Sequence, residues 1–171
     1  MKTVVVYESV YGNTHQVAEC IAEVARTKGE VMVVPVSGAT EEVVAGADML
    51  IVGGPTHVHG MTSATTWRGA IADAEKKHLQ LDPDAVGMGL REWFDGLGTQ
   101  QHARAVAFDT RFDGPVVFTG RAAKGISRRL DEHGFALCAG PESFLVDKAN
   151  HLIAGEAERA RRWAADVLET V

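Results

Sequence analysis

Five short apolar segments rich in β-branched residues predict strands. They are residues 3–7, 31–34, 49–52, 105–108 and 135–138. None shows the strict alternation of apolar and polar positions that marks a half-exposed strand, so each is expected to be buried on both faces of a parallel sheet. Proline lacks the N–H group that a central strand needs, so the fifth segment is expected to break at Gly140-Pro141 and to resume over residues 143–146.

Between these segments, apolar residues recur every three or four positions, which is the spacing of an amphipathic helix. The pattern predicts helices over residues 17–28, 90–97, 122–133 and 156–171, and a short one from residue 40. The connection from Gly53 to about Arg104 is long enough for two helices. Strands that alternate with helices favour a doubly wound α/β fold, with helices on both faces of the sheet. The whole chain, residues 1–171, is expected to form a single domain.

Composition narrows the classes of function. The net charge of −6 argues against nucleic acid as the main partner. No apolar run approaches the ~20 residues that cross a bilayer, and Met1-Lys2 leads into a β-branched segment rather than a secretory signal. Cys20 and Cys138 have no CxxC spacing, so buried free thiols are expected. We therefore expect a cytoplasmic protein without membrane or nucleic-acid partners.

The loop after the first predicted strand has the chemistry of a phosphate site. It reads Ser9-Val10-Tyr11-Gly12-Asn13-Thr14, and a predicted helix follows at once. The start of a helix offers unpaired N–H groups and the positive end of a dipole, and the short polar side chains of the loop add further donors. Gly12 allows the backbone to approach a ligand closely. The loop holds no cation, which fits a phosphate dianion bound by neutral donors.

A simpler interpretation of this loop stays open. It lacks the GxxxxGK[ST] sequence of a Walker A loop and the GxGxxG sequence of a dinucleotide-binding Rossmann fold. The alternative to a phosphate site is a tight strand-to-helix turn in which Asn13 or Thr14 is an ordinary helix cap.

The same loop resembles the phosphate-binding signature of the flavodoxin family, in which Ser or Thr begins the loop and Gly-Asn-Thr ends it. The resemblance covers nearly the whole chain in the order of its elements. It is also carried by residues 48–56, 107–111 and 122–126. It implies a five-stranded parallel sheet of order 2-1-3-4-5, with FMN as the cofactor across the carboxyl edge of the sheet.

In that family two further loops hold the flavin ring, and the resemblance assigns them to two segments of this chain. The first supplies Pro55, Thr56, His57, His59 and Gly60, and the second supplies Asp109, Thr110, Arg111, Phe112 and Asp113. The phosphate loop adds Ser9, Tyr11, Gly12, Asn13 and Thr14 to this candidate FMN site. No residue is assigned a catalytic role, because the flavin itself carries the chemistry.

The first ring loop departs from the common family pattern. Many flavodoxins place Trp or another aromatic residue there, whereas this chain has His57 and His59. Imidazole can stack on a flavin but covers less of it. Two histidines at this spacing can also bind a metal, but no third and fourth ligands follow at a recognisable spacing, so no metal is assigned. Gly60 is expected to give a peptide of this loop the freedom to turn.

In the second ring loop, Phe112 is the aromatic residue able to stack on the flavin. Arg111 beside it is a fixed cation, and two interpretations of it stay open. It either contacts the flavin or forms a surface ion pair with Asp109 or Asp113.

Together these patterns favour an FMN-binding redox protein. It is either an electron carrier or an FMN-dependent oxidoreductase of the NAD(P)H or quinone type, with a redox protein or a small-molecule electron acceptor as its partner. The small number of aromatic residues in the ring loops keeps a second hypothesis open, a regulatory or scaffolding domain of the same fold without a cofactor.

Overall fold

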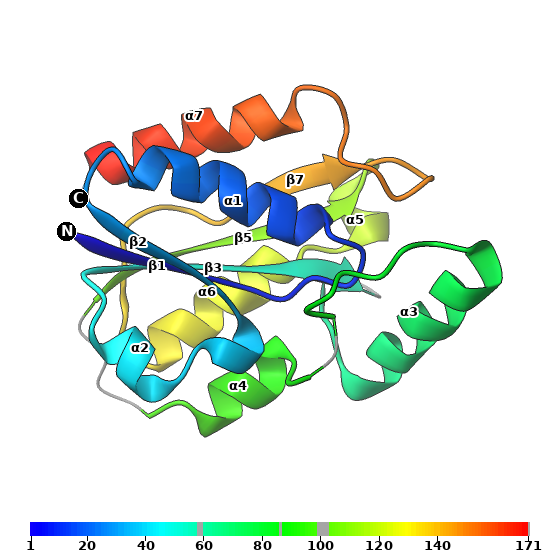
Figure 1. Ribbon diagram of the computed structural model, residues 1–171, viewed down its shortest axis with the longest axis horizontal. Coiled ribbons are helices and arrows are strands. Elements are labelled where there is room, and N and C mark those ends of the chain that lie inside the picture. The colour runs from blue at the N-terminus through cyan, green and yellow to red at the C-terminus, as the bar shows by residue number, and fades with distance from the viewer. Residues whose placement is uncertain (58–59, 86, 99–102, 171) are drawn as a thin grey trace.

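The computed structural model describes residues 1–57, 60–85, 87–98 and 103–170. Its centre is a parallel sheet with helices on both faces (Figure 1). No helix in these residues is both long enough and apolar enough to cross a membrane.

The sheet has the predicted order. It is built from β1 (Lys2–Tyr7), β2 (Glu30–Pro35), β3 (Met49–His57), β5 (Arg104–Phe112), β6 (Ala136–Leu137) and β7 (Glu142–Val146). The strands lie in the order β2-β1-β3-β5, and both β6 and β7 pair with the far side of β5 in parallel. The short strands β6 and β7 together form the fifth predicted strand, and the break between them contains Gly140 and Pro141. The order 2-1-3-4-5 is therefore confirmed.

The helices divide between the two faces of the sheet. On one face lie α1 (Asn13–Ala25) and α7 (Glu156–Glu169), which pack side by side (Figure 1). On the other lie α2 (Glu41–Ala45), α4 (Leu90–Gly96) and α6 (Ala122–Glu132). The helix α3 (Ala64–Lys77) lies beyond the carboxyl end of β3, and with α4 it fills the long connection for which two helices were predicted.

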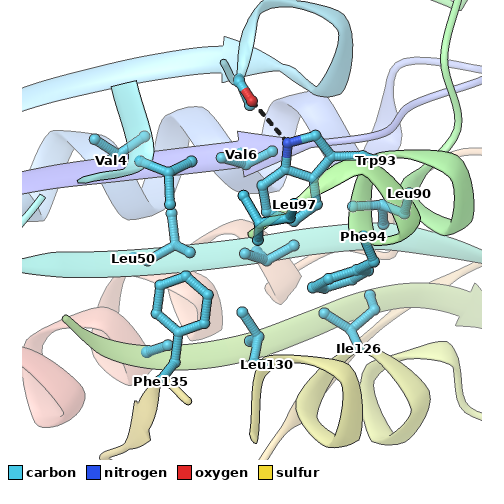
Figure 2. Close-up of a cluster of buried hydrophobic side chains, with 14 of the residues drawn as sticks. Val4, Val6, Leu50, Leu90, Trp93, Phe94, Leu97, Ile126, Leu130 and Phe135 are labelled. Atoms are coloured by element: carbon cyan, nitrogen blue, oxygen red, sulfur yellow. Dashed lines mark hydrogen bonds between the residues drawn. The ribbon is translucent and has the colours of Figure 1, made fainter. Parts of the chain in front are cut away.

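Alternate residues of each central strand face two separate apolar cores. Val4 and Val6 of β1 point toward α4 and α6, whereas Val5 and Tyr7 point toward α1 and α7. Figure 2 shows the first core, where Trp93 and Phe94 of α4 pack over the sheet. The Trp93 Nε1–H group donates a hydrogen bond to the Ala39 carbonyl at 2.7 Å, so this buried indole has a partner.

Two strands extend further than their apolar composition predicts. β3 continues to His57 and β5 continues to Phe112, so the first residues of both predicted ring loops belong to strands. The extension is possible because Gly53 and Gly54 have no side chains. A Cβ atom on Gly53 would lie 2.0 Å from the Phe108 ring, and one on Gly54 would lie 2.5 Å from Leu90.

Two short elements were not predicted. β4 (Gly60–Met61) pairs antiparallel with the end of β3, and α5 (Val116–Thr119) forms a single turn after β5. Neither has enough residues to show a hydrophobic period, so only their tertiary contacts define them.

Candidate functional site

The loop after β1 has the geometry that a phosphate loop needs. Gly12 precedes α1 with φ of +89°, a conformation that a residue with a Cβ adopts only under strain. The Gly12 N–H donates to Ser9 Oγ at 3.1 Å, which closes the loop. The first helical hydrogen bond runs from the Gln16 N–H to the Gly12 carbonyl, so the N–H groups of residues 13–15 have no partner within the helix.

This loop and the ends of three strands enclose a small cavity of about 50 Å³. From the predicted site it is lined by Ser9, Tyr11, Asn13, Thr14, Pro55, Thr56, His57, Thr110, Arg111 and Phe112. The structure therefore brings together one face made by the phosphate loop and one made by the two predicted ring loops. This cavity is called the phosphate-loop cavity below.

Two hydrogen bonds join the start of α1 to the opposite wall of this cavity. Thr14 Oγ1 lies 2.8 Å from Thr110 Oγ1 of β5, and the Asn13 side-chain amide donates to the Asn150 carbonyl at 2.8 Å. In the hydrogen bond between the two hydroxyls, one donates its proton and the other accepts it. The accepting hydroxyl therefore still has a proton to donate to another group. Neither Asn13 nor Thr14 caps α1 through its side chain, since the residue before the helix is Gly12.

Two buried nitrogen atoms of residues that line this cavity lack partners within the described parts of the chain. They are His57 Nε2 and Arg111 Nε. Burial lowers the pKa of His57, so its imidazole is neutral at neutral pH. Buried polar atoms in folded proteins almost always have a hydrogen-bond partner. These two atoms therefore mark positions where a bound group could complete the site.

The guanidinium group of Arg111 mainly holds its own loop together. Its Nη1 donates to the Gly114 carbonyl at 2.8 Å and to Thr119 Oγ1 at 3.1 Å. Within the described residues, no ion pair joins it to Asp109 or Asp113, the two partners expected for a surface arginine. Next to it, Phe112 lines the cavity with 49% of its surface exposed.

Asp109 lies apart from the cavity lining. It is fully buried in β5, where its Oδ2 accepts hydrogen bonds from the Thr56 hydroxyl at 3.1 Å and the Ala123 N–H at 2.7 Å. Thr56 in turn accepts the Ala122 N–H, so the two side chains cap the start of α6. Burial raises the pKa of Asp109, and the hydrogen bond from Ala123 opposes that rise.

The remaining predicted site residues occupy three different settings. Gly60 lies in β4 opposite His57, and the peptide turn expected at this glycine stays a prediction. Asp113 has an exposed side chain, and its N–H donates to the Val146 carbonyl. His59 lies outside the described residues.

Three lining residues were missed by the sequence analysis. They are Val10, Val146 and Asn150. Val146 ends β7 at the same edge of the sheet, and Asn150 adopts a left-handed φ of 68° in the turn that follows. A local signal existed for Asn150, because asparagine favours such turns. Its position beside α1 depends on the fold.

Comparison with known proteins agrees with this geometry. A family model described as a flavodoxin domain matches residues 4–67. No curated protein matches the chain. Oxidised flavodoxin 1 from Bacillus cereus superposes with a TM-score of 0.68 at 18% identity, covering 100% of this chain and 99% of that one.

Two other solved structures have the same architecture. The Streptococcus pneumoniae TIGR4 flavodoxin has a TM-score of 0.67 at 15% identity, and each chain covers 100% of the other. A WrbA-like flavodoxin from Agrobacterium tumefaciens has a TM-score of 0.56 at 22% identity, covering 98% of this chain and 95% of that one. With the family match limited to residues 4–67, this agreement shows that the chain has a flavodoxin-like fold.

Proposed function

We propose that this protein binds FMN in the phosphate-loop cavity and works through it as an electron carrier or an FMN-dependent oxidoreductase. One observation carries the proposal. The loop after β1 and the ends of β3 and β5 line a single cavity, and two buried nitrogen atoms there, His57 Nε2 and Arg111 Nε, have no partner in the described structure.

The donor set fits a phosphate group. The first turn of α1 supplies N–H groups and the positive end of its dipole. Ser9 Oγ accepts the Gly12 N–H, which leaves the Ser9 hydroxyl proton free to be donated. Thr14 or Thr110 supplies a second hydroxyl proton. All of these donors are neutral, so a phosphate dianion would be held by hydrogen bonds and the helix dipole.

The cavity size limits where the rest of FMN would lie. At about 50 Å³, the cavity is far smaller than the roughly 300–1,000 Å³ of pockets that enclose a whole small-molecule ligand. That is room for a phosphate group and not for a whole flavin. The ring would therefore lie at the mouth of the cavity, where the exposed face of Phe112 offers a stacking surface and His57 and Arg111 offer donors.

FMN supplies the electron-transfer chemistry when it is bound, so the chain's residues need only bind it, orient it and exclude water from it. The three solved structures described above are each named as a flavodoxin, which supports this assignment. The exposed apolar residues of α5, Val117 and Phe118, lie close in sequence to Phe112 and are suited to contact a redox partner.

The direct test is a titration of the purified protein with FMN, in which flavin fluorescence and visible absorption are the signals measured. We expect saturable 1:1 binding that quenches the fluorescence, and weaker binding of riboflavin, which has no phosphate. Absence of saturable FMN binding would favour the cofactor-free scaffolding domain. Steady-state oxidation of NADPH by the FMN-loaded protein with a quinone acceptor then separates an oxidoreductase from a carrier.

A further inference from the structure

A second, larger cavity lies on the other side of the phosphate loop. Its volume is about 320 Å³, within the range of roughly 300–1,000 Å³ that small-molecule sites occupy. Tyr7 and Glu8 line this cavity, whereas Ser9 and the residues after it line the phosphate-loop cavity. The chain between β1 and α1 is therefore a wall shared by the two cavities.

The polar part of this larger cavity contains two unpaired buried atoms. Glu8 is 8% exposed and Thr62 is 4% exposed, and both line the cavity. Glu8 Oε2 accepts the Leu90 N–H at 2.9 Å. Burial raises the pKa of Glu8, and hydrogen bonds from the Leu90 N–H and the Thr62 side chain oppose the rise. Apart from this contact with each other, neither Glu8 Oε1 nor Thr62 Oγ1 has a hydrogen-bond partner within the described residues. A carboxylate oxygen and a hydroxyl group thus lie together with no partner except each other.

The other walls suit a flat, uncharged molecule. The Trp67 indole N–H donates to the Ala85 carbonyl at 2.8 Å, so the surface left for a ligand is the hydrocarbon part of the ring. Val36 and Met88 add further apolar surface. The charged residues of the lining carry both signs, Arg68 and Arg91 against Glu8, Asp84 and Glu92, and the single excess negative charge disfavours an anion.

The loop that closes this cavity is held in place by side chains from β1 and α1. The Tyr7 hydroxyl donates to Asp84 at 2.7 Å, and His15 Nδ1 lies 3.1 Å from Asp82. The Asp82 N–H also donates to the carbonyl of Val10 in the phosphate loop. These contacts fix the loop that carries Asp82 and Asp84 against β1 and the start of α1.

We propose that this cavity binds a second small molecule, a flat and uncharged compound with an N–H group next to a C=O group, such as a primary carboxamide or a lactam. Its N–H would donate to Glu8 Oε1, its carbonyl would accept the Thr62 hydroxyl proton, and its ring would pack on Trp67. The proposal does not depend on FMN binding elsewhere. The simplest competing occupant is a bound water, which could satisfy the same two atoms.

The test is titration of ¹⁵N-labelled protein with benzamide at alkaline pH, so that Glu8 is ionised although burial raises its pKa. The readout is the indole N–H resonance of Trp67, assigned through Trp67→Phe. We expect a saturable shift, and at least about tenfold weaker binding of benzoate, because a second carboxylate would face that of Glu8. Glu8→Gln should abolish this preference, since a glutamine amide can donate to either compound.

Two further variants test whether the effect of Glu8→Gln on binding comes from a general change in charge or in folding. Glu92→Gln removes a charge from the same cavity and keeps an acceptor for the Gly89 N–H, so it should preserve the preference for benzamide. Thr62→Val keeps the shape of the side chain and should weaken benzamide if Glu8→Gln fails to fold. Three results would overturn the proposal and indicate a water site instead. They are the lack of a saturable shift, equal affinities for benzamide and benzoate, and a loss of the preference for benzamide in Glu92→Gln as large as that in Glu8→Gln.

FMN itself carries a lactam edge, so the titration is repeated in the presence of saturating FMN. Independent binding of benzamide supports a second site. Competition between the two would mean that the flavin ring occupies this cavity, which would overturn the proposal and relocate the ring of the proposed cofactor.

Discussion

Thr14 connects the start of α1 to the opposite wall of the phosphate-loop cavity. Its hydroxyl is paired with that of Thr110, and the residue is 1% exposed. We expect Thr14→Val to weaken FMN binding by about 1–2 kcal/mol, the scale of a hydrogen bond to a charged group. Riboflavin binding should change little. Thr27→Val, at the far end of the same helix, is the matched control in the fluorescence titration. Equal weakening of both ligands would contradict a phosphate role.

Asp109 predicts a pH dependence of stability. Burial raises its pKa, so the folded state holds this proton more tightly than the unfolded state does. The wild-type protein therefore loses stability as the pH rises from about 3.9, the ordinary value for Asp, through the folded-state pKa. The asparagine of Asp109→Asn does not titrate. The melting temperature of the variant minus that of the wild type should therefore be constant below about pH 3.9 and should increase as the pH rises from there to the folded-state pKa of Asp109.

The comparison is made by thermal unfolding across a pH series. The matched control is Asp113→Asn, which removes the same charge from an exposed side chain just beyond β5. A constant difference between Asp109→Asn and the wild type at every pH would show that Asp109 is not the group that titrates.

At the scale of elements, the close packing of β3 against β5 depends on Gly53. A Cβ atom there would lie within 2.3 Å of three atoms of the Phe108 ring, which is fully buried and has no space to move into. We expect Gly53→Ala to lower the free energy of unfolding by at least about 3 kcal/mol, at the upper end of overpacking effects. Gly69→Ala is the opposite control, because nothing lies within 4 Å of that position in α3.

In Gly69→Ala the new methyl group meets no neighbour and alanine favours the helix, so stability should rise by up to about 1 kcal/mol. Urea unfolding of both variants gives the two changes on one scale. Similar small changes in both would mean that Phe108 can move aside and that the packing at Gly53 is loose.

Some of the secondary-structure elements could be predicted from the sequence and others could not. The central strands β1, β3 and β5 were predictable because their apolar residues are buried on both faces, whereas β2 and β6 are only partly buried or exposed. The break in the fifth strand was predictable because Pro141 cannot donate to the sheet. The turn α5 was not, since Val116, Val117 and Phe118 favour a strand locally. Its helical form follows Pro115 and the hydrogen bonds of Arg111 to Gly114 and Thr119.

The same distinction applies to the two cavities. The phosphate loop is continuous in sequence, so its donors could be identified from local pattern. The pairing of Glu8 with Thr62 could not, because the two residues meet only after β1 and β3 pair and the chain returns past β4. The resemblance to the flavodoxin family assigns Asp109 to the candidate FMN site, and only the fold shows that its carboxylate accepts a hydrogen bond from the Ala123 N–H at the start of α6.

For the whole molecule, ligand binding at the carboxyl edge should stabilise the entire fold. The proposed FMN site draws on β1, β3, β5 and β7, which belong to one sheet. A ligand at 100 times its Kd adds about 2.7 kcal/mol to the free energy of unfolding, and for a chain of this size each kcal/mol raises Tm by about 2–4 °C. FMN should therefore raise Tm by roughly 5–10 °C.

The measurement is thermal unfolding followed by circular dichroism, with and without FMN. Riboflavin at the same concentration should raise Tm less, because it cannot use the phosphate loop. An unchanged Tm in the presence of FMN would contradict the proposed cofactor, whatever its effect on fluorescence.

The packing of α1 against α7 has a consequence for the synthesis of this protein. The buried faces of the two helices share one core, with Val17 and Ile21 on α1 and Ala164 and Leu168 on α7. Ribosomes add about 5–20 residues per second, so α1 emerges on the order of ten seconds before the helix that covers it. Until then its apolar face is open to water, to other nascent chains and to chaperones. A chain arrested before Glu156 should therefore stay on the ribosome as a protease-sensitive intermediate and reach its folded form only after α7 has been released.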